Sequence, residues 1–399
     1  MKIKSAVYIF SAAGFMIIMS LLSCSNSHNQ TSAPFRNEID SIAVTWIPDI
    51  QEGVFEASVH RNGSRYVLVG ETDNPGAKKA LTGFLEKKGV IFTDSMKVLP
   101  DTTEVKKAWG LVTVSVCNIR AYHSFDAELV SQALMGTPVK ILKNEDGWMM
   151  IQTPDTYIGW VDNDAVQSMT KGEYDSWKAS PRIFYTRKTG DILAEPQGND
   201  VVSDIVAGSV LRIGRDVNGS AGVILPDGRK GFIGKNDAIP FSNMTASKYL
   251  SRENLIKTAK SFMGIPYLWG GTSSKGFDCS GFVKTVYYLN GVVLQRDASQ
   301  QFGHGLRIMR SWYPDSLKPG DLLFFGSAKR GRLHATHVAM YIGNTEFIHA
   351  SGMVKINSLD STRQNFSRFR RDSFLGVRRI IGAPSDNGIS SLSGNCWYY

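Results

Sequence analysis

A glycine-rich loop that leads directly into a short apolar helix places the strongest constraint on how this chain can fold. The loop runs from Tyr267 to Asp278, and the residues after it carry apolar side chains at helical spacing up to Gly291. This pattern predicts a helix of about three turns with Asp278 as its N-cap and Gly291 just beyond its end. Cys279 then lies in the first turn, where unpaired N–H groups and the helix dipole favour a thiolate. We therefore interpret Cys279 as a nucleophile rather than as a buried structural cysteine.

The start of the chain has the pattern of a secretory signal. Two lysines precede an apolar run at residues 6–22, which stops at a serine and Cys24. A basic start, an apolar middle and small residues near the end predict that residues 1–23 are a signal peptide. The end of the run also resembles a bacterial lipobox, so we expect a lipid anchor on Cys24, a polar linker at residues 24–34 and a place in the cell envelope, on the periplasmic or outer-membrane face. A plain membrane helix is the alternative, although the run is barely long enough.

The composition is that of an ordinary globular protein. Hydrophobic residues make up 42% of the 399 residues and charged residues 20%, which is enough chain for two to four domains. The net charge of +9 falls to +7 if Lys2 and Lys4 leave with the signal peptide. This surplus suits an exported protein near an anionic polymer, and in the absence of a nucleic-acid-binding motif we expect no nucleic-acid partner. Cys117, Cys279 and Cys396 are spaced too widely for a disulfide framework or a zinc motif.

Strand and helix patterns divide the rest of the chain. Short strands at regular spacing predict a small β-barrel, and a weaker second copy follows in which Phe232 stands where the first has Trp160. Helices followed by hairpin-linked strands then indicate an α+β domain rather than a doubly wound sheet. The last residues are polar, and we expect them to be mobile. The predicted units are a small α/β unit at 35–105, two barrels at 106–170 and 171–246, the α+β domain at 247–383 and the tail at 384–399.

Two histidines could activate the predicted nucleophile. His337 opens a strand, and His349 lies in the next strand after a turn at residues 343–344. Antiparallel pairing would bring both imidazoles to one edge of the sheet beside Cys279, so that Cys279 attacks, His337 moves the proton and His349 orients His337. His334 offers an alternative, a zinc site with the other two histidines, but no nearby carboxylate or cysteine completes the ligand set. We expect neither a metal nor a cofactor.

Four segments in this order resemble the NlpC/p60 family of papain-like cell-wall cysteine peptidases. They are Tyr267-Leu-Trp-Gly-Gly, Phe277-Asp-Cys-Ser-Gly-Phe, Leu317-Lys-Pro-Gly-Asp and His337-Val-Ala-Met-Tyr-Ile-Gly. The strand order of the two barrels is similar to that of bacterial SH3-like domains. Together these features resemble the γ-D-glutamyl-L-diamino-acid endopeptidases, also called dipeptidyl-peptidase VI. The resemblance implies an α+β protein with a papain-like catalytic domain that cleaves between D-Glu and the diamino acid of peptidoglycan stem peptides.

The resemblance also implies roles for single residues. Cys279, His337 and His349 would form the triad, and Tyr267 would support the oxyanion and the thiol. The first SH3-like domain would recognise the free N-terminal amine of L-Ala, for which a carboxylate and an aromatic wall are suited. After the aspartate at position 297, the family subgroup often has a serine, whereas this chain has Ala298. The implied substrate-binding residues are Glu128, Tyr157, Trp269, Asp278, Ser280 and Asp297.

Two other functional classes stay open at this point. The chain could be a wall-binding lipoprotein that uses its SH3-like domains and has an idle catalytic domain, although the intact cysteine and histidines disfavour this. A papain-like amidase or acyltransferase on lipids is the other, but the sequence shows no apolar substrate groove.

Overall fold

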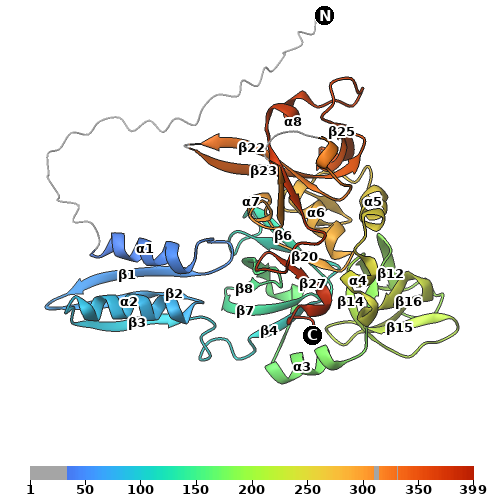
Figure 1. Ribbon diagram of the computed structural model, residues 1–399. Helices are drawn as coiled ribbons and strands as arrows, with labels where there is room; N and C mark the ends of the chain where they lie inside the picture. The colour runs from blue at the N-terminus through green and yellow to red at the C-terminus, as the bar shows by residue number, and fades with distance from the viewer. Residues whose placement is uncertain (1–33, 310–313, 330) are drawn as a thin grey trace, which may run out of the picture.

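The computed structural model describes residues 34–309, 314–329 and 331–399. The predicted signal peptide and Cys24 lie outside the described residues. Within the described part of the chain, no helix has the length and apolar character needed to cross a bilayer. Figure 1 shows the N-terminal unit in blue at one end, the two barrel-like units in teal to yellow-green below, and the C-terminal domain, mostly in orange and red, above them.

The N-terminal unit is a three-stranded sheet covered by helices. Strands β1 and β2 form an antiparallel hairpin, and β3 pairs with β2 in parallel after the crossover helix α2. The side chain of Asn74 caps α2 by accepting the N–H groups of Gly76 and Ala77. The elements are α1 (Arg36–Trp46), β1 (Phe55–Asn62), β2 (Arg65–Thr72), α2 (Pro75–Lys87) and β3 (Phe92–Val98).

Two seven-stranded antiparallel sheets follow, and they have the same strand order. The first unit has the order β10-β4-β7-β8-β9-β5-β6, and the second, read from its other edge, has β17-β11-β14-β15-β16-β12-β13. Trp160 of β9 pairs with β5, and Phe232 of β16 pairs with β12, so these two residues occupy equivalent positions. The internal repeat expected from the sequence is therefore present.

The strands of the first unit are β4 (Trp109–Val112), β5 (Val116–Arg120), β6 (Leu129–Leu134), β7 (Pro138–Glu145), β8 (Trp148–Gln152), β9 (Ile158–Asp162) and β10 (Val166–Met169). Helix α3 (Lys171–Ala179) connects the units. The strands of the second unit are β11 (Arg182–Tyr185), β12 (Thr189–Leu193), β13 (Val201–Val206), β14 (Val210–Ile213), β15 (Ser220–Ile224), β16 (Lys230–Gly234) and β17 (Ala238–Pro240).

The C-terminal domain packs a central helix against a six-stranded antiparallel sheet. The sheet order is β21-β26-β22-β23-β24-β25. Helix α6 packs on one face, where it meets Val338 and Met340, while Ala339 and Tyr341 face a second core on the other side. Two helices precede the glycine-rich loop, and they are separated at Ser251, whose side chain caps the second one. This arrangement is the α+β architecture that the sequence predicts.

The helices of this domain are α4 (Ala246–Tyr249), α5 (Arg252–Ser261), α6 (Cys279–Tyr288), α7 (Ala298–Gln301) and α8 (Arg368–Asp372). Its main sheet contains β21 (Leu306–Met309), β22 (Leu322–Lys329), β23 (Arg332–Gly343), β24 (Glu346–Ser351), β25 (Met353–Ser358) and β26 (Phe374–Arg379). Two short pairs are β18 (Thr272–Ser273) with β19 (Gly276–Phe277), and β20 (Val292–Leu294) with β27 (Ile389–Ser391).

The C-terminal tail is ordered, so the expectation of a mobile tail is wrong. Strand β27 pairs with β20, and the residues after it pack against both seven-stranded units. Tyr398 is buried, Trp397 meets Trp109 edge to face, and the guanidinium of Arg182 donates to the Tyr398 carbonyl at 2.8 Å. The polar residues of the tail predict mobility. Burial of the aromatic side chains at its end stabilises the ordered tail by more free energy than the loss of chain entropy costs.

Candidate active site

Cys279 is the first residue of α6, as the sequence predicts. The side chain of Asp278 caps the helix by accepting the N–H of Gly281 at 2.7 Å. The helix start lies tightly against the glycine-rich loop, because a Cβ at Gly281 would come within 2.0 Å of the Gly271 carbonyl oxygen. Cys279 is only 8% exposed. Loop and helix together therefore hold the sulfur at one fixed place.

The two predicted histidines meet through a hydrogen bond between neighbouring strands. The Nε2 atom of His337, on β23, lies 2.8 Å from Nδ1 of His349, on β24. Nε2 of His349 lies 3.0 Å from Oδ1 of Asn357, on β25. The amide nitrogen of Asn357 donates to the carbonyl of Asn365 at 2.9 Å, so its oxygen has to face His349.

This chain of contacts fixes the tautomer of each ring. Because the Asn357 oxygen can only accept, Nε2 of neutral His349 carries a proton and its Nδ1 is free to accept. His337 then donates from its own Nε2, which leaves Nδ1 of His337 as the acceptor on that ring. The sequence did not point to Asn357, because one asparagine in a polar strand carries no distinguishing signal.

Burial shapes the protonation of the three groups. It raises the pKa of the Cys279 thiol, and the nearby Asp278 carboxylate adds to the rise, while the N–H of Val338 lowers it. Burial also lowers the pKa of His337 well below its usual range and that of His349 to about 4. Desolvation by burial thus opposes the stabilisation that the helix terminus gives to a thiolate. Burial therefore favours the neutral thiol at Cys279 and the neutral imidazole at His337.

An open cleft of about 340 Å³ lies over Cys279, between the catalytic domain and the first seven-stranded unit. His337 and His349 are buried, and the residues just before His337, 334–336, line the cleft. Ala298 also lines the cleft and offers no polar group there. The other eight predicted site residues all line it: Glu128, Tyr157, Tyr267, Trp269, Asp278, Cys279, Ser280 and Asp297.

A carboxylate and an indole from different domains meet at one end of this cleft. The indole N–H of Trp269 donates to Oε1 of Glu128 at 2.7 Å. Trp269 is 61% exposed, so its ring forms an open wall. Tyr157 is buried beside them, and burial raises the pKa of Asp297 above the usual range of a carboxyl group. This end of the cleft is thus acidic and aromatic.

Arg296 is a site residue that the sequence did not reveal. Its buried guanidinium pairs with Asp278, and it donates to the hydroxyl groups of Ser280 at 2.9 Å and Ser131 at 3.1 Å. Asp278 also accepts the N–H of Gly270 at 3.0 Å, so both its oxygens are engaged. Asp278 lines the cleft chiefly as the cap and ion-pair partner that holds the helix start.

Arg370, on α8, is a second cation that sequence patterns did not single out. Burial is the larger cause of the low pKa of His337, and the charge of Arg370 lowers this pKa further. The same charge interacts with Cys279 and Tyr267. Burial raises the pKa of Tyr267 to about 12, and the neighbouring sulfur adds to this. Tyr267 therefore keeps its proton at neutral pH and can donate a hydrogen bond beside Cys279.

The described residues offer no metal site, since they contain no group of three or more His, Cys, Asp or Glu side chains placed to hold an ion. His334 faces the cleft, whereas His337 and His349 bind each other. The zinc alternative weighed above therefore lacks its geometry in this part of the chain.

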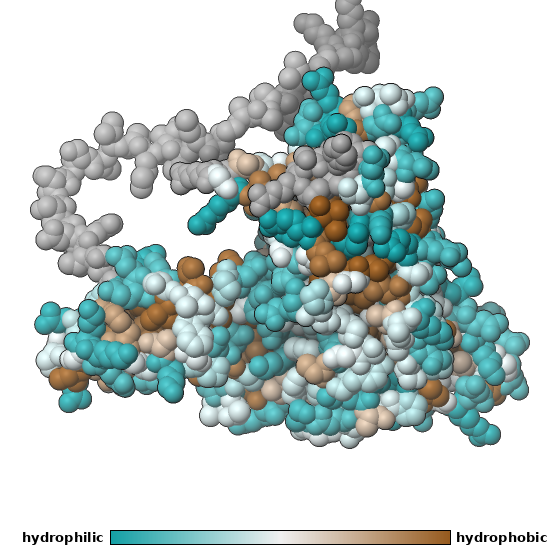
Figure 2. Space-filling model, in the orientation of Figure 1, coloured by the Kyte–Doolittle hydropathy of each residue, from teal (hydrophilic) through white to brown (hydrophobic). Residues whose placement is uncertain are grey.

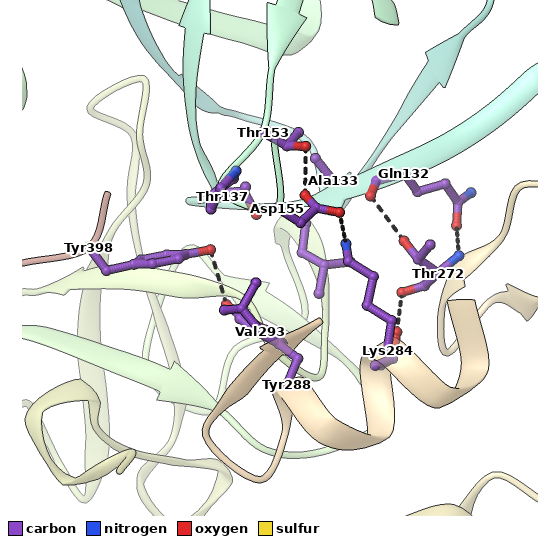
Figure 3. Close-up of a pocket in the computed structure, with 13 residues that line it drawn as sticks. Gln132, Ala133, Thr137, Thr153, Asp155, Thr272, Lys284, Tyr288, Val293 and Tyr398 are labelled. Atoms are coloured by element: carbon purple, nitrogen blue, oxygen red, sulfur yellow. Dashed lines mark hydrogen bonds and ion pairs between the residues drawn. The ribbon is translucent and has the colours of Figure 1, made fainter. Parts of the chain in front are cut away.

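A buried junction fixes the first unit against α6 (Figure 3). Lys284 of α6 reaches Asp155 at 2.9 Å, and Thr153 donates to the same carboxylate at 2.7 Å. On the other side, Thr272 donates through its N–H and its hydroxyl to Gln132, both at 3.0 Å. The cavity left here measures only about 50 Å³. This cavity belongs to the domain interface. The contacts around it hold the first unit, and with it Glu128, over the cleft.

Comparisons with known proteins agree with this architecture. Residues 264–371 match the model of the NlpC/P60 family, and residues 119–166 match that of the bacterial dipeptidyl-peptidase Sh3 domain. A crystal structure of an NlpC/P60 family protein from Bacillus cereus superposes with a TM-score of 0.59 at 24% identity, over 68% of this chain and 99% of that one.

Curated relatives cover the same region. Dipeptidyl-peptidase 6 of Lysinibacillus sphaericus is 31% identical over 262 residues, which are 63% of this chain and 92% of the relative. The γ-D-glutamyl-L-lysine dipeptidyl-peptidase of Bacillus cereus is 28% identical over 268 residues, or 64% of this chain and 78% of the relative. The chain therefore belongs to the NlpC/P60 family of cysteine peptidases.

Proposed function

We propose that this peptidase hydrolyses the bond between γ-D-Glu and the diamino acid in peptidoglycan stem peptides that begin with a free L-Ala amine. The observation that carries the proposal is the cleft itself, which has Cys279 in its floor and the Glu128–Trp269 pair at one end. The names of the relatives, which refer to γ-D-glutamyl-L-lysine and to dipeptide release, support this substrate class.

We assign Cys279 as the nucleophile and His337 as the general base. As the sulfur attacks the γ-carbonyl carbon, its proton moves to Nδ1 of His337, so that the thiolate forms only during the attack. We assign the N-terminus of α6 and the hydroxyl of Tyr267 to stabilise the charge that develops on the carbonyl oxygen. His349 accepts from His337 throughout and keeps the ring in place.

The two products leave in sequence. The His337 imidazolium returns its proton to the departing amine of the diamino acid, and the L-Ala-γ-D-Glu portion stays on the sulfur as a thioester. His337 then takes a proton from water, which attacks the thioester and releases the dipeptide. The thiol regains its proton, and the cycle closes without any group beyond these residues.

The acidic end of the cleft suits the substrate's ammonium group. Glu128 is positioned by Trp269, and Asp297 has a pKa raised by burial, so an incoming positive charge would favour its ionised form. Acylated or longer N-termini lack this charge or place it elsewhere. The enzyme would accordingly act on stem peptides that other enzymes have already cut from the glycan.

Replacing Cys279 with alanine tests the mechanism. Cys279→Ala should abolish dipeptide release from L-Ala-γ-D-Glu-L-diamino-acid tripeptides, because no other group can form the thioester. Mass spectrometry of the products is the measurement, and the unfolding midpoint serves as the folding control. Undiminished release of the dipeptide by this variant would refute the assignment of the nucleophile.

For its location we propose export and lipidation at Cys24, on the strength of the N-terminal pattern alone. Metabolic labelling with a fatty acid should mark the wild type but not Cys24→Ala. Equal labelling of both would contradict the anchor.

A further inference from the structure

The N-terminal α/β unit reaches the cleft through the loop between α1 and β1. Gln51, in this loop, lines the cleft together with Glu128 and Tyr157. Figure 1 places the unit beside the first seven-stranded unit, and Figure 2 shows the surface hollowed between it and the β22–β23 hairpin above. The mechanism makes no use of this unit, although the unit supplies part of the cleft wall.

Backbone contacts hold the loop against the first unit. The N–H of Ile158 donates to the Gln51 carbonyl at 2.7 Å, and the side chain of Gln152 donates to the Glu52 carbonyl at 3.1 Å. Val54 of the loop's end is buried with Ile158. Because Ile158 follows Tyr157 directly, this anchoring fixes Gln51 at the amine end of the cleft. The anchoring uses the main-chain carbonyl of Gln51 and does not occupy its side chain.

Side chains of the same loop hold the segment that carries Asp297. The Gln300 amide nitrogen donates to Asp49 at 2.8 Å, and the Gln300 oxygen accepts the N–H of Asp297 at 2.9 Å. Glu52 accepts from Gln295, and more distantly from Gln300 at 3.4 Å. The loop thus connects the first unit on one side to the start of α7 on the other.

From these contacts we infer that the loop closes the amine end of the cleft and that Gln51 is a specificity-determining residue for short peptides with a free N-terminus. The inference rests on the proposed function. The Gln51 amide oxygen can accept a hydrogen bond from an ammonium group. The volume of the Gln51 side chain would block the direction in which an acylated or longer N-terminus would extend. Asp49 and Glu52 are positioning residues, since they act through Gln300 and Gln295.

Substitutions of similar size separate the polar role of Gln51 from its bulk. Against free and N-acetylated tripeptides, Gln51→Glu should keep the preference for the free amine. Gln51→Met keeps the volume and should raise KM for the free peptide severalfold with kcat unchanged, as expected when only uniform binding is lost. Gln51→Ala removes both, and the ratio of kcat/KM for free over acetylated peptide should fall by about tenfold.

The positioning role has its own variant. Asp49→Ala should raise KM for the free peptide more than KM for the acetylated peptide, because the segment that carries Asp297 loses a contact. Glu86→Gln, on the exposed face of α2, is the matched control in the same unit and should change nothing. Unfolding midpoints of all variants show whether each folds.

The outcomes separate the two claims. If the wild type releases no dipeptide, the proposed function fails and takes this inference with it. If the wild type is active and folded Gln51→Ala keeps the full preference for the free amine, the inference alone is overturned.

Discussion

At the residue scale, the tautomer of His337 is set by Asn357, which lies two strands away in the sheet. Asn357 has its amide nitrogen committed to Asn365, and this leaves only an acceptor for His349. His349 in turn can only accept from His337. An asparagine and a buried histidine thus perform the orienting role that a carboxylate performs in other triads, without placing a negative charge beside the base.

A single-atom change at Asn357 tests this account through the pH profile. In Asn357→Asp, the new carboxylate raises the pKa of His349 from its value of about 4. Protonated His349 cannot accept from His337, so the acid limb of kcat should move to higher pH by roughly one unit or more. Burial and the positive charges of Arg370 and Lys355 oppose this shift and are present in both proteins. An unmoved acid limb would contradict the orienting role of His349.

The buried pair of Arg296 and Asp278 gives a second residue-scale prediction. Arg296→Met leaves a carboxylate buried without its partner and should cost about 3–5 kcal/mol of unfolding free energy. Adding Asp278→Asn, which keeps a good N-cap, removes that charge and should recover much of the loss. Urea unfolding of the single and double variants measures the difference. A double variant no more stable than Arg296→Met would contradict this explanation.

At the element scale, the sequence predicts what is local. The helix start at Cys279 and the strand positions of His337 and His349 follow from caps, turns and alternation, and the structure has each of them there. The roles of Asn357 and Arg296 could not be predicted from the sequence, because they depend on neighbours that tertiary packing brings close. The depth at which Cys279 is buried could not be predicted for the same reason, since the elements that cover it are not part of the helix pattern.

The tail shows the same limit. Its polar residues predict mobility, yet Tyr398 and Trp397 pack between the catalytic domain and both seven-stranded units. Ending the chain after Asn395 should therefore lower the unfolding free energy by about 3–5 kcal/mol, as for the loss of a large buried aromatic residue. Cys396→Ser, at an exposed position, is the control. Equal urea midpoints for the truncated and full chains would mean that the tail adds no packing.

At the scale of the whole molecule, the cleft is a product of domain arrangement. The catalytic domain supplies Cys279 and Trp269, the first unit supplies Glu128 and Tyr157, and the N-terminal unit supplies Gln51. The Asp155–Lys284 junction keeps the first two together. Sequence resemblance predicted the meeting of Glu128 with Trp269, but it had no pattern from which to place the N-terminal unit.

The central claim is that this arrangement selects a free amine and delivers the peptide to Cys279. The most direct test compares kcat/KM for L-Ala-γ-D-Glu-L-diamino-acid and its N-acetylated form in the wild type and in Glu128→Gln. Loss of one charge-assisted contact is worth about ten- to hundredfold. We predict that the wild type prefers the free peptide by at least that factor and that Glu128→Gln loses most of the preference. Equal wild-type rates on the two peptides would contradict the account.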